Sequence, residues 1–67
     1  MDFIDRLKQE REELKFKTYK LGAFLASERK NQIDPNQKVL LFMQYEVMKI
    51  YLQILDRRLE LLGCVEE

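Results

Sequence analysis

The stretch Asp34-Pro35-Asn36-Gln37 lies near the middle of this 67-residue chain and contains its only proline. An Asp at the N-cap of a helix accepts hydrogen bonds from the free amides of the first turn. A Pro at the next position has no amide to leave unsatisfied, and Gln37 completes an Asp-x-x-Gln variant of the capping box. The stretch therefore predicts that a helix begins at Pro35.

Gly63 marks the other end of this helix, because glycine is typical of the C′ position, so the helix should cover about residues 35–62. In the first half of the chain, Asp2 can cap a second helix, and good helix formers continue for most of that half. We expect this helix over about residues 3–30 and a turn over residues 31–34. Two helices of similar length joined by a short turn form an antiparallel αα-hairpin, so the fold class should be all-α and the whole chain a single helical-hairpin domain.

Both predicted helices carry apolar residues at heptad spacing, and the second helix carries more than one partner can cover. Its seam consists of Leu41, Tyr45, Met48, Leu52, Leu55, Leu59 and Leu62, and a second stripe of Leu40, Val47, Ile50, Ile54 and Leu61. One partner helix covers one seam, and monomers avoid a contiguous exposed apolar strip. A chain of this length also rarely obtains more than about 3–5 kcal/mol from its own core. We therefore expect a homo-oligomeric helical bundle, either a dimer of hairpins or a larger ring.

Polar residues stand within or beside these seams. They are Arg11 and Thr18 in the first helix, among Ile4, Leu7, Leu14, Leu21 and Leu25, and Gln44, Tyr51 and Arg58 in the second. In an antiparallel hairpin, residues whose numbers sum to about 65 should face one another, which places Arg11 near Leu55.

Two interpretations of these polar residues stay open. In the first, they fix register and oligomer number, with Arg11 or Arg58 paired to an acid such as Glu12, Asp56 or Glu60. In the second, they line a pocket at a subunit junction, where arginine binds phosphate and tyrosine stacks on a base.

The charge of the chain argues against long nucleic acids as partners. Twelve Lys and Arg residues balance twelve Asp and Glu residues, whereas general affinity for DNA or RNA needs an excess of positive charge. Residues 14–30 nevertheless hold five basic residues and one acid. This local excess is typical of a solvated helix face, and it would also suit a small polyanion.

Catalysis has little support in the sequence. The chain has no His, one Ser and one Thr, and its single Cys64 has no neighbouring base. We expect a protein that is not an enzyme and has no metal site and no cofactor. No apolar run is long enough to span a membrane, no targeting segment is expected, and a free thiol fits a reducing cytoplasm.

A family resemblance adds to this interpretation. It rests on Phe3-Ile4-x-Arg6-Leu7, Glu13-Leu14 and Lys20-Leu21-x-x-Phe24-Leu25 in the first half, and on Leu40-Leu41-x-x-Gln44-x-x-x-Met48-x-x-Tyr51-x-x-Ile54-Leu55-x-x-Arg58-Leu59-x-Leu61 in the second. Over residues 3–62 the chain resembles small helical-hairpin proteins of crAss-like phages. Those proteins are similar to the hairpin of the anti-CBASS and Thoeris anti-defence sponges.

The resemblance implies a hexamer of hairpins that sequesters cyclic di- or trinucleotide immune signals in the host bacterial cytoplasm without cleaving them. The uncovered apolar surface of the second helix leaves a dimer possible as well. The ligand would lie between protomers. Lys15 or Lys17 would bind phosphate from the first helix and Arg58 from the second, and Tyr51 or Tyr19 would stack on a base.

Two other functions remain open. The alternative is an oligomeric protein-interaction module that binds a host protein through exposed apolar helix surface, in the helix-in-groove manner. Arg11, Thr18, Gln44 and Arg58 would then only set the register. The third is a small RNA-binding four-helix dimer, which would need basic residues aligned on one exposed face.

Overall fold

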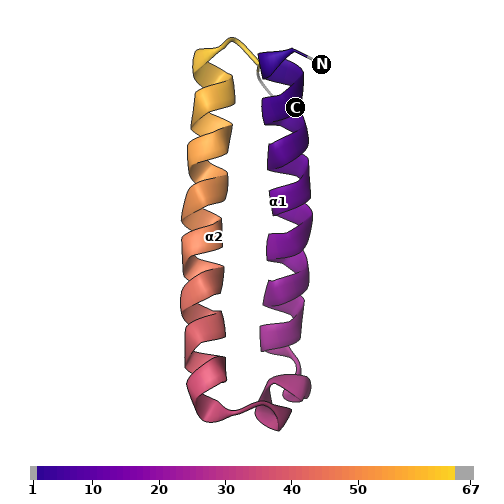
Figure 1. Ribbon diagram of the computed structural model, residues 1–67, viewed down its shortest axis with the longest axis vertical. Coiled ribbons are helices and arrows are strands. Elements are labelled where there is room, and N and C mark those ends of the chain that lie inside the picture. Colours follow the sequence, from indigo (N-terminus) through magenta and orange to yellow (C-terminus); the bar gives the residue numbers. More distant parts are fainter. Residues whose placement is uncertain (1, 65–67) are drawn as a thin grey trace.

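The computed structural model describes residues 2–64 as two antiparallel α-helices lying side by side (Figure 1). Helix α1 covers Phe3–Ala26, a short 3₁₀ helix, η1, covers Glu28–Gln32, and α2 covers Pro35–Leu61. The described part of the chain contains no strand, so the prediction of an all-helical hairpin is confirmed. The outermost residues of the single domain expected over the whole chain lie outside residues 2–64.

Capping interactions fix where α1 and α2 begin and where α2 ends. The backbone N–H of Asp5 donates to Oδ1 of Asp2 at 2.8 Å, and the N–H of Asn36 donates to Oδ1 of Asp34 at 2.7 Å. Both predicted N-caps are therefore confirmed, although the bond of Asp34 goes to Asn36 rather than to Gln37. Gly63 has a φ of +82°, the left-handed conformation expected of a C′ glycine.

The end of α2 is a Schellman motif. The N–H of Cys64 donates to the carbonyl of Leu59 at 2.8 Å, and the N–H of Gly63 donates to the carbonyl of Glu60 at 2.9 Å. These two bonds satisfy carbonyls that the end of the helix would otherwise leave without partners.

The prediction that the first helix continues to about residue 30 is wrong. Helix α1 ends at Ala26, and Ser27 begins the connection. The Ser27 hydroxyl donates to the carbonyl of Phe24 at 2.7 Å, and its oxygen accepts from the N–H of Arg29 at 3.3 Å. A serine side chain that bonds the nearby backbone in this way competes with the helix. The connection therefore runs from Ser27 to Asp34 and includes η1, so it is longer than the expected turn over residues 31–34.

The core is small and lies between the two helices. The apolar side chains that are buried are Leu7, Leu25, Leu55 and Leu59. Leu7, Leu55 and Leu59 form one cluster near the open end of the hairpin, and Leu14 and Cys64 pack against it. The predicted seam of α2 faces α1, except that Leu62 is exposed.

Gly22, near the end of α1 that leads into the connection, makes room for a side chain of α2. A Cβ atom added to Gly22 would lie 2.9 Å from Oη of Tyr45 and 3.0 Å from a carbon of its ring. These distances leave no room for a methyl group unless Tyr45 moves. The seam residue Tyr45 thus fits because α1 carries a glycine opposite it.

Candidate functional site

The structure distributes the candidate binding residues over two opposite sides of the hairpin. Residues three, four or seven apart share one face of a helix. Two such rows flank the packed contact between α1 and α2, one on each side. We call them the Tyr51 side and the Arg11 side. The Tyr51 side contains Phe3, Glu10 and Lys17 of α1 with Gln44, Tyr51 and Arg58 of α2, and the Arg11 side contains Arg11, Lys15 and Tyr19 of α1 with Asp56 of α2.

On the Tyr51 side, two contacts join the helices. The Tyr51 hydroxyl donates a hydrogen bond to the Glu10 carboxylate, and the Arg58 guanidinium lies over the Phe3 ring, 5.8 Å from its centroid. Both pairs of residue numbers sum to 61, and continuing this register places Lys17 across from Gln44. Two cationic side chains, an amide and a phenol therefore line one exposed row.

The hydrogen bond to Glu10 also affects the titration of Tyr51. It raises the pKa of the phenol above its ordinary value, with smaller contributions from burial and from the negative charge of Glu10, while Arg58 acts in the opposite direction. The phenol therefore stays protonated and can donate a hydrogen bond throughout the physiological pH range.

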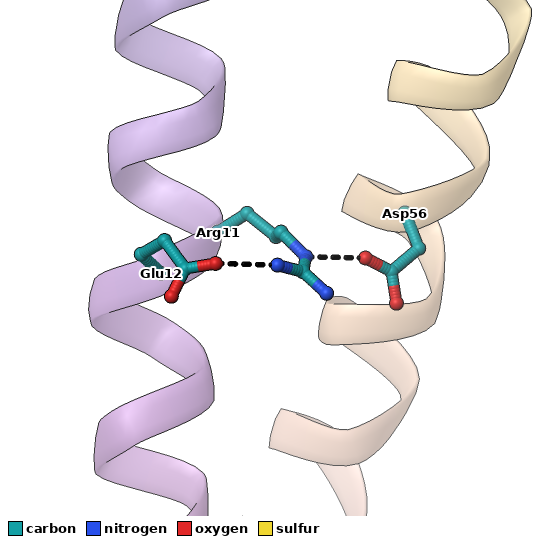
Figure 2. Close-up of polar contacts among 3 residues, drawn as sticks. All are labelled: Arg11, Glu12 and Asp56. Atoms are coloured by element: carbon teal, nitrogen blue, oxygen red, sulfur yellow. Dashed lines mark hydrogen bonds and ion pairs between the residues drawn. The ribbon is translucent and has the colours of Figure 1, made fainter. Parts of the chain in front are cut away.

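On the Arg11 side, an ion-pair bridge connects the two helices (Figure 2). Nε of Arg11 lies 2.6 Å from Oδ1 of Asp56, and Nη1 lies 2.5 Å from Oε1 of Glu12. The Arg11 side chain is only 12% exposed, whereas that of Asp56 is 44% exposed. Of the acids considered from the sequence, Glu12 and Asp56 are indeed partners of Arg11. Glu60 instead pairs with Arg57 at 3.0 Å.

The remaining candidates differ in their access to a ligand. Thr18 is buried between the helices, and its hydroxyl donates to the carbonyl of Leu14 at 2.7 Å. Lys15 and Tyr19 are exposed, and two successive four-residue steps from Arg11 place them on the Arg11 side. The structure thus groups Lys17, Gln44, Tyr51 and Arg58 on one side, Arg11, Lys15 and Tyr19 on the other, and Thr18 between them.

Part of the basic stretch over residues 14–30 contacts aromatic rings of its own segment. Nζ of Lys20 lies 4.5 Å from the centroid of the Phe16 ring, and the guanidinium of Arg29 lies 5.7 Å from that of Phe24. These contacts cover the exposed ring of Phe16 and the half-buried ring of Phe24 with the stems and charges of long side chains.

Two partners in the site were missed from the sequence, namely Phe3 and Glu10. The signal for both was present, since each stands on α1 seven residues from the next member of its row, in the same spacing as Tyr51 and Arg58 on α2. An antiparallel register specific to this side of the hairpin, in which residue numbers sum to 61, pairs Phe3 with Arg58 and Glu10 with Tyr51.

Other sites receive no support from the geometry. Within residues 2–64, no three side chains among His, Cys, Asp and Glu come together as a metal ion would require. Cys64 packs half-buried against the leucine cluster. No helix in this part of the chain has both the length and the hydrophobicity to cross a membrane.

Comparison with known proteins gives one result that covers most of the chain. The model of the Sequestin family matches residues 1–61, a range that contains all of α1, η1 and α2. No curated protein and no solved structure gives a significant match.

Proposed function

The chain belongs to the Sequestin family, and we propose that it is a phage anti-defence protein that sequesters cyclic oligonucleotide immune signals without cleaving them. The family name denotes sequestration of a ligand. The resemblance to phage hairpin proteins and to the anti-CBASS and Thoeris anti-defence sponges supports the narrower choice of ligand. Immune evasion would then result from holding the signal away from its receptor in the host cytoplasm.

The arrangement of the Tyr51 side is the structural observation that supports this function. An aromatic ring and a guanidinium stand seven residues apart on α2, about 10 Å along the helix, and Lys17 belongs to the facing row of α1. Guanidinium and ammonium groups bind phosphate through charge-assisted hydrogen bonds, and an aromatic ring offers a stacking surface to any base. Arg58 and Lys17 would hold phosphates while Tyr51 stacks on a base.

Glu10 and Gln44 would complete recognition in this site. A carboxylate accepts hydrogen bonds from the amino groups of bases, and an amide both donates and accepts. On binding, Glu10 would exchange its bond with Tyr51 for one with the ligand. The one hydroxyl among these groups that contacts a carboxylate is that of Tyr51, and the contact with Glu10 raises the pKa of the phenol rather than lowering it, so it does not activate a nucleophile. We therefore propose a binder and not an enzyme.

The proposed sponge is also a homo-oligomer, with a hexamer favoured and a dimer possible. The polar row of the Tyr51 side is open in a single hairpin, and exposed ion pairs and hydrogen bonds contribute little in water. Burial of this row between protomers would strengthen each contact, because charges attract more strongly at lower effective dielectric.

The direct test is a depletion assay with the full chain. Purified protein is mixed with individual cyclic di- and trinucleotides, the filtrate is quantified by chromatography, and the protein is then denatured. The proposal predicts depletion of at least one cyclic nucleotide and its recovery intact. Recovery only as hydrolysed product, or no depletion of any cyclic nucleotide, would contradict it.

Arg58→Ala separates ligand binding from a structural role, and Arg29→Ala is its matched control. Both arginines lie over a phenylalanine ring at nearly equal distance, but at opposite ends of the hairpin. We expect Arg58→Ala to lose ligand depletion while the oligomer keeps its mass in light scattering, and Arg29→Ala to change neither. A changed mass with Arg58→Ala would instead support a role in fixing the oligomer.

The exposed stripe on α2 favours one second candidate, a module that binds a host protein helix. Leu40, Val47, Ile50, Ile54 and Leu61 are all exposed in the hairpin. Such a module would bind no cyclic nucleotide, and Arg58→Ala would leave its partner binding unchanged. The depletion assay therefore distinguishes the two candidates.

A further inference from the structure

Helix α2 carries a second complete heptad seam on the face turned away from α1. The members follow alternating steps of three and four residues, the spacing of a and d positions in a coiled coil. They are Leu40, Met43, Val47, Ile50, Ile54 and Leu61, with Arg57 as the one polar member. The six apolar side chains are between 51% and 71% exposed, so the hairpin leaves this outer seam without a partner.

The accessible surface area of the hairpin indicates how much surface is left uncovered for a partner. A compact monomer of 8.2 kDa should expose roughly 4,500 Å², whereas this chain exposes 5410 Å². The excess is about 900 Å², close to the roughly 800 Å² that each partner buries in a standard interface. The Cα radius of gyration agrees, since it is 14.6 Å against about 11 Å for a compact chain of this length.

We propose that the outer seam of α2 packs antiparallel against the outer seam of a second copy of this chain, about a twofold axis near residue 52. A seam of a and d positions is complementary to another such seam, and the second copy provides one. In the resulting four-layer arrangement, the two α2 helices lie inside and the two α1 helices outside.

Arg57 determines the orientation. In a parallel pair, equal positions face each other, and Arg57 would meet the partner's Arg57 inside the seam. In an antiparallel pair, a positions face d positions. The register that packs Ile50 against the partner's Ile54 places Arg57 beside the partner's Glu46. Arg57 already pairs with Glu60 in its own hairpin at 3.0 Å, so it would lie between two carboxylates that would otherwise repel each other.

The antiparallel pair also extends the Tyr51 side, an outcome that rests on the proposed function. Gln44, Tyr51 and Arg58 occupy the e positions of the outer seam, and antiparallel packing places the e positions of both helices along one edge. Tyr51 then lies next to the partner's Tyr51, and Arg58 next to the partner's Gln44. Each site would thus receive residues from two copies, and it would be incomplete in one hairpin.

The first test measures the mass of the full chain by light scattering during gel filtration. Wild-type protein should have at least twice the mass of one chain. Ile54→Glu places a carboxylate against the partner's Ile50 and should lower the mass at least twofold, while circular dichroism stays helical. Phe16→Glu makes the same kind of change at a similarly exposed residue on the outer face of α1, and it should leave the mass unchanged.

A wild-type monomer would overturn the proposal. So would equal effects of Ile54→Glu and Phe16→Glu, because the outer seam would then not be the interface. If the outer seam of α2 binds another protein and not a second copy of this chain, the wild-type protein will be a monomer.

The second test determines orientation by cross-linking with a short bis-maleimide in a Cys64→Ser background. Gln53→Cys lies near the proposed twofold axis and should cross-link to its own copy. Arg57→Cys should not, because its equivalent lies 10 residues away along the partner helix, about 15 Å. Efficient cross-linking of Arg57→Cys, or none with Gln53→Cys, would overturn the antiparallel register. Neither test uses a nucleotide, so failure of the sponge proposal in the depletion assay would leave both results interpretable.

Discussion

The substitution Leu55→Ala should remove most of the stability that the hairpin obtains from its own core. Leu55 is 0% exposed and packs in the cluster with Leu7 and Leu59. Its truncation removes three buried carbon groups, a transfer term of about 2.4 kcal/mol at about 0.8 kcal/mol each. The cavity left behind brings the total to about 3–4 kcal/mol, within the range for buried leucines. A core of this size supplies only about 3–5 kcal/mol in all.

The assay is urea unfolding followed by circular dichroism, with all proteins at one protomer concentration because association stabilises the folded state by mass action. Leu40→Ala is the matched control, since it is the same change on the same helix. Leu40 is 56% exposed, and in the proposed antiparallel register it lies at the outer end of the seam, opposite the partner's Cys64, which follows the end of α2. We expect Leu40→Ala to change the free energy of unfolding by about 0.5 kcal/mol or less.

A loss of less than about 1 kcal/mol with Leu55→Ala would refute the reasoning, because a wholly buried leucine cannot be truncated so cheaply unless the site collapses. Equal losses with Leu55→Ala and Leu40→Ala would refute it as well. In that case the free energy of folding would come mainly from contacts between copies and not from the cluster inside each hairpin.

Three further predictions concern single contacts. The raised pKa of Tyr51 means that the folded state favours the protonated phenol, so the contribution of the Tyr51–Glu10 bond to stability is present below pH of about 10 and is lost as pH rises through the folded pKa. In a titration followed by tyrosinate absorbance, Tyr51 of the Glu10→Gln variant should therefore ionise at a lower pH than Tyr51 of the wild type. Arg11→Met should change the free energy of unfolding by no more than about 1 kcal/mol, because the released Asp56 is partly exposed and remains hydrated, and it should leave cyclic-nucleotide depletion intact. Gly63→Ala should destabilise by about 1 kcal/mol in thermal unfolding because of its positive φ; an unchanged midpoint would show that the C′ conformation is not required.

The start and end of α2 could be predicted from the sequence because their signals are local. An Asp-Pro pair and a glycine after the last leucines act within one helical turn. The end of α1 was missed because it depends on a competition. Residues 28–30 are good helix formers, and the hydroxyl of Ser27 nevertheless bonds the backbone around it and ends the helix early.

The candidate site could be predicted only in part, because a hairpin has two sides with different registers. Arg11 and Asp56 sum to 67 on one side, whereas Glu10 and Tyr51 sum to 61 on the other. A single register, in which facing residue numbers sum to about 65, placed Arg11 next to Leu55, one residue from its actual partner Asp56. It did not find Glu10, since adjacent residues on a helix point about 100° apart.

The two sides also differ in what they leave for a ligand. On the Arg11 side, the guanidinium is largely buried and bound to two carboxylates, so a phosphate would have to displace Asp56 and Glu12. On the Tyr51 side, the guanidinium of Arg58 lies over an aromatic ring. A phosphate that binds its N–H groups does not have to displace Asp56 or Glu12. This contrast favours Arg58 over Arg11 as the phosphate ligand, although both were candidate binding residues in the sequence.

Tight binding on the Tyr51 side cannot come from one hairpin, and this links the proposed function to the proposed interface. Surface charge pairs contribute about 0–1 kcal/mol each, whereas a micromolar ligand needs about 8 kcal/mol. A few exposed contacts from Lys17, Tyr51 and Arg58 fall short of that sum. Residues from a second copy add contacts, and the surrounding protein excludes water from those already present. Breaking the outer seam at Ile54 should therefore weaken ligand binding as well as assembly, whereas truncating Arg58 should weaken binding alone.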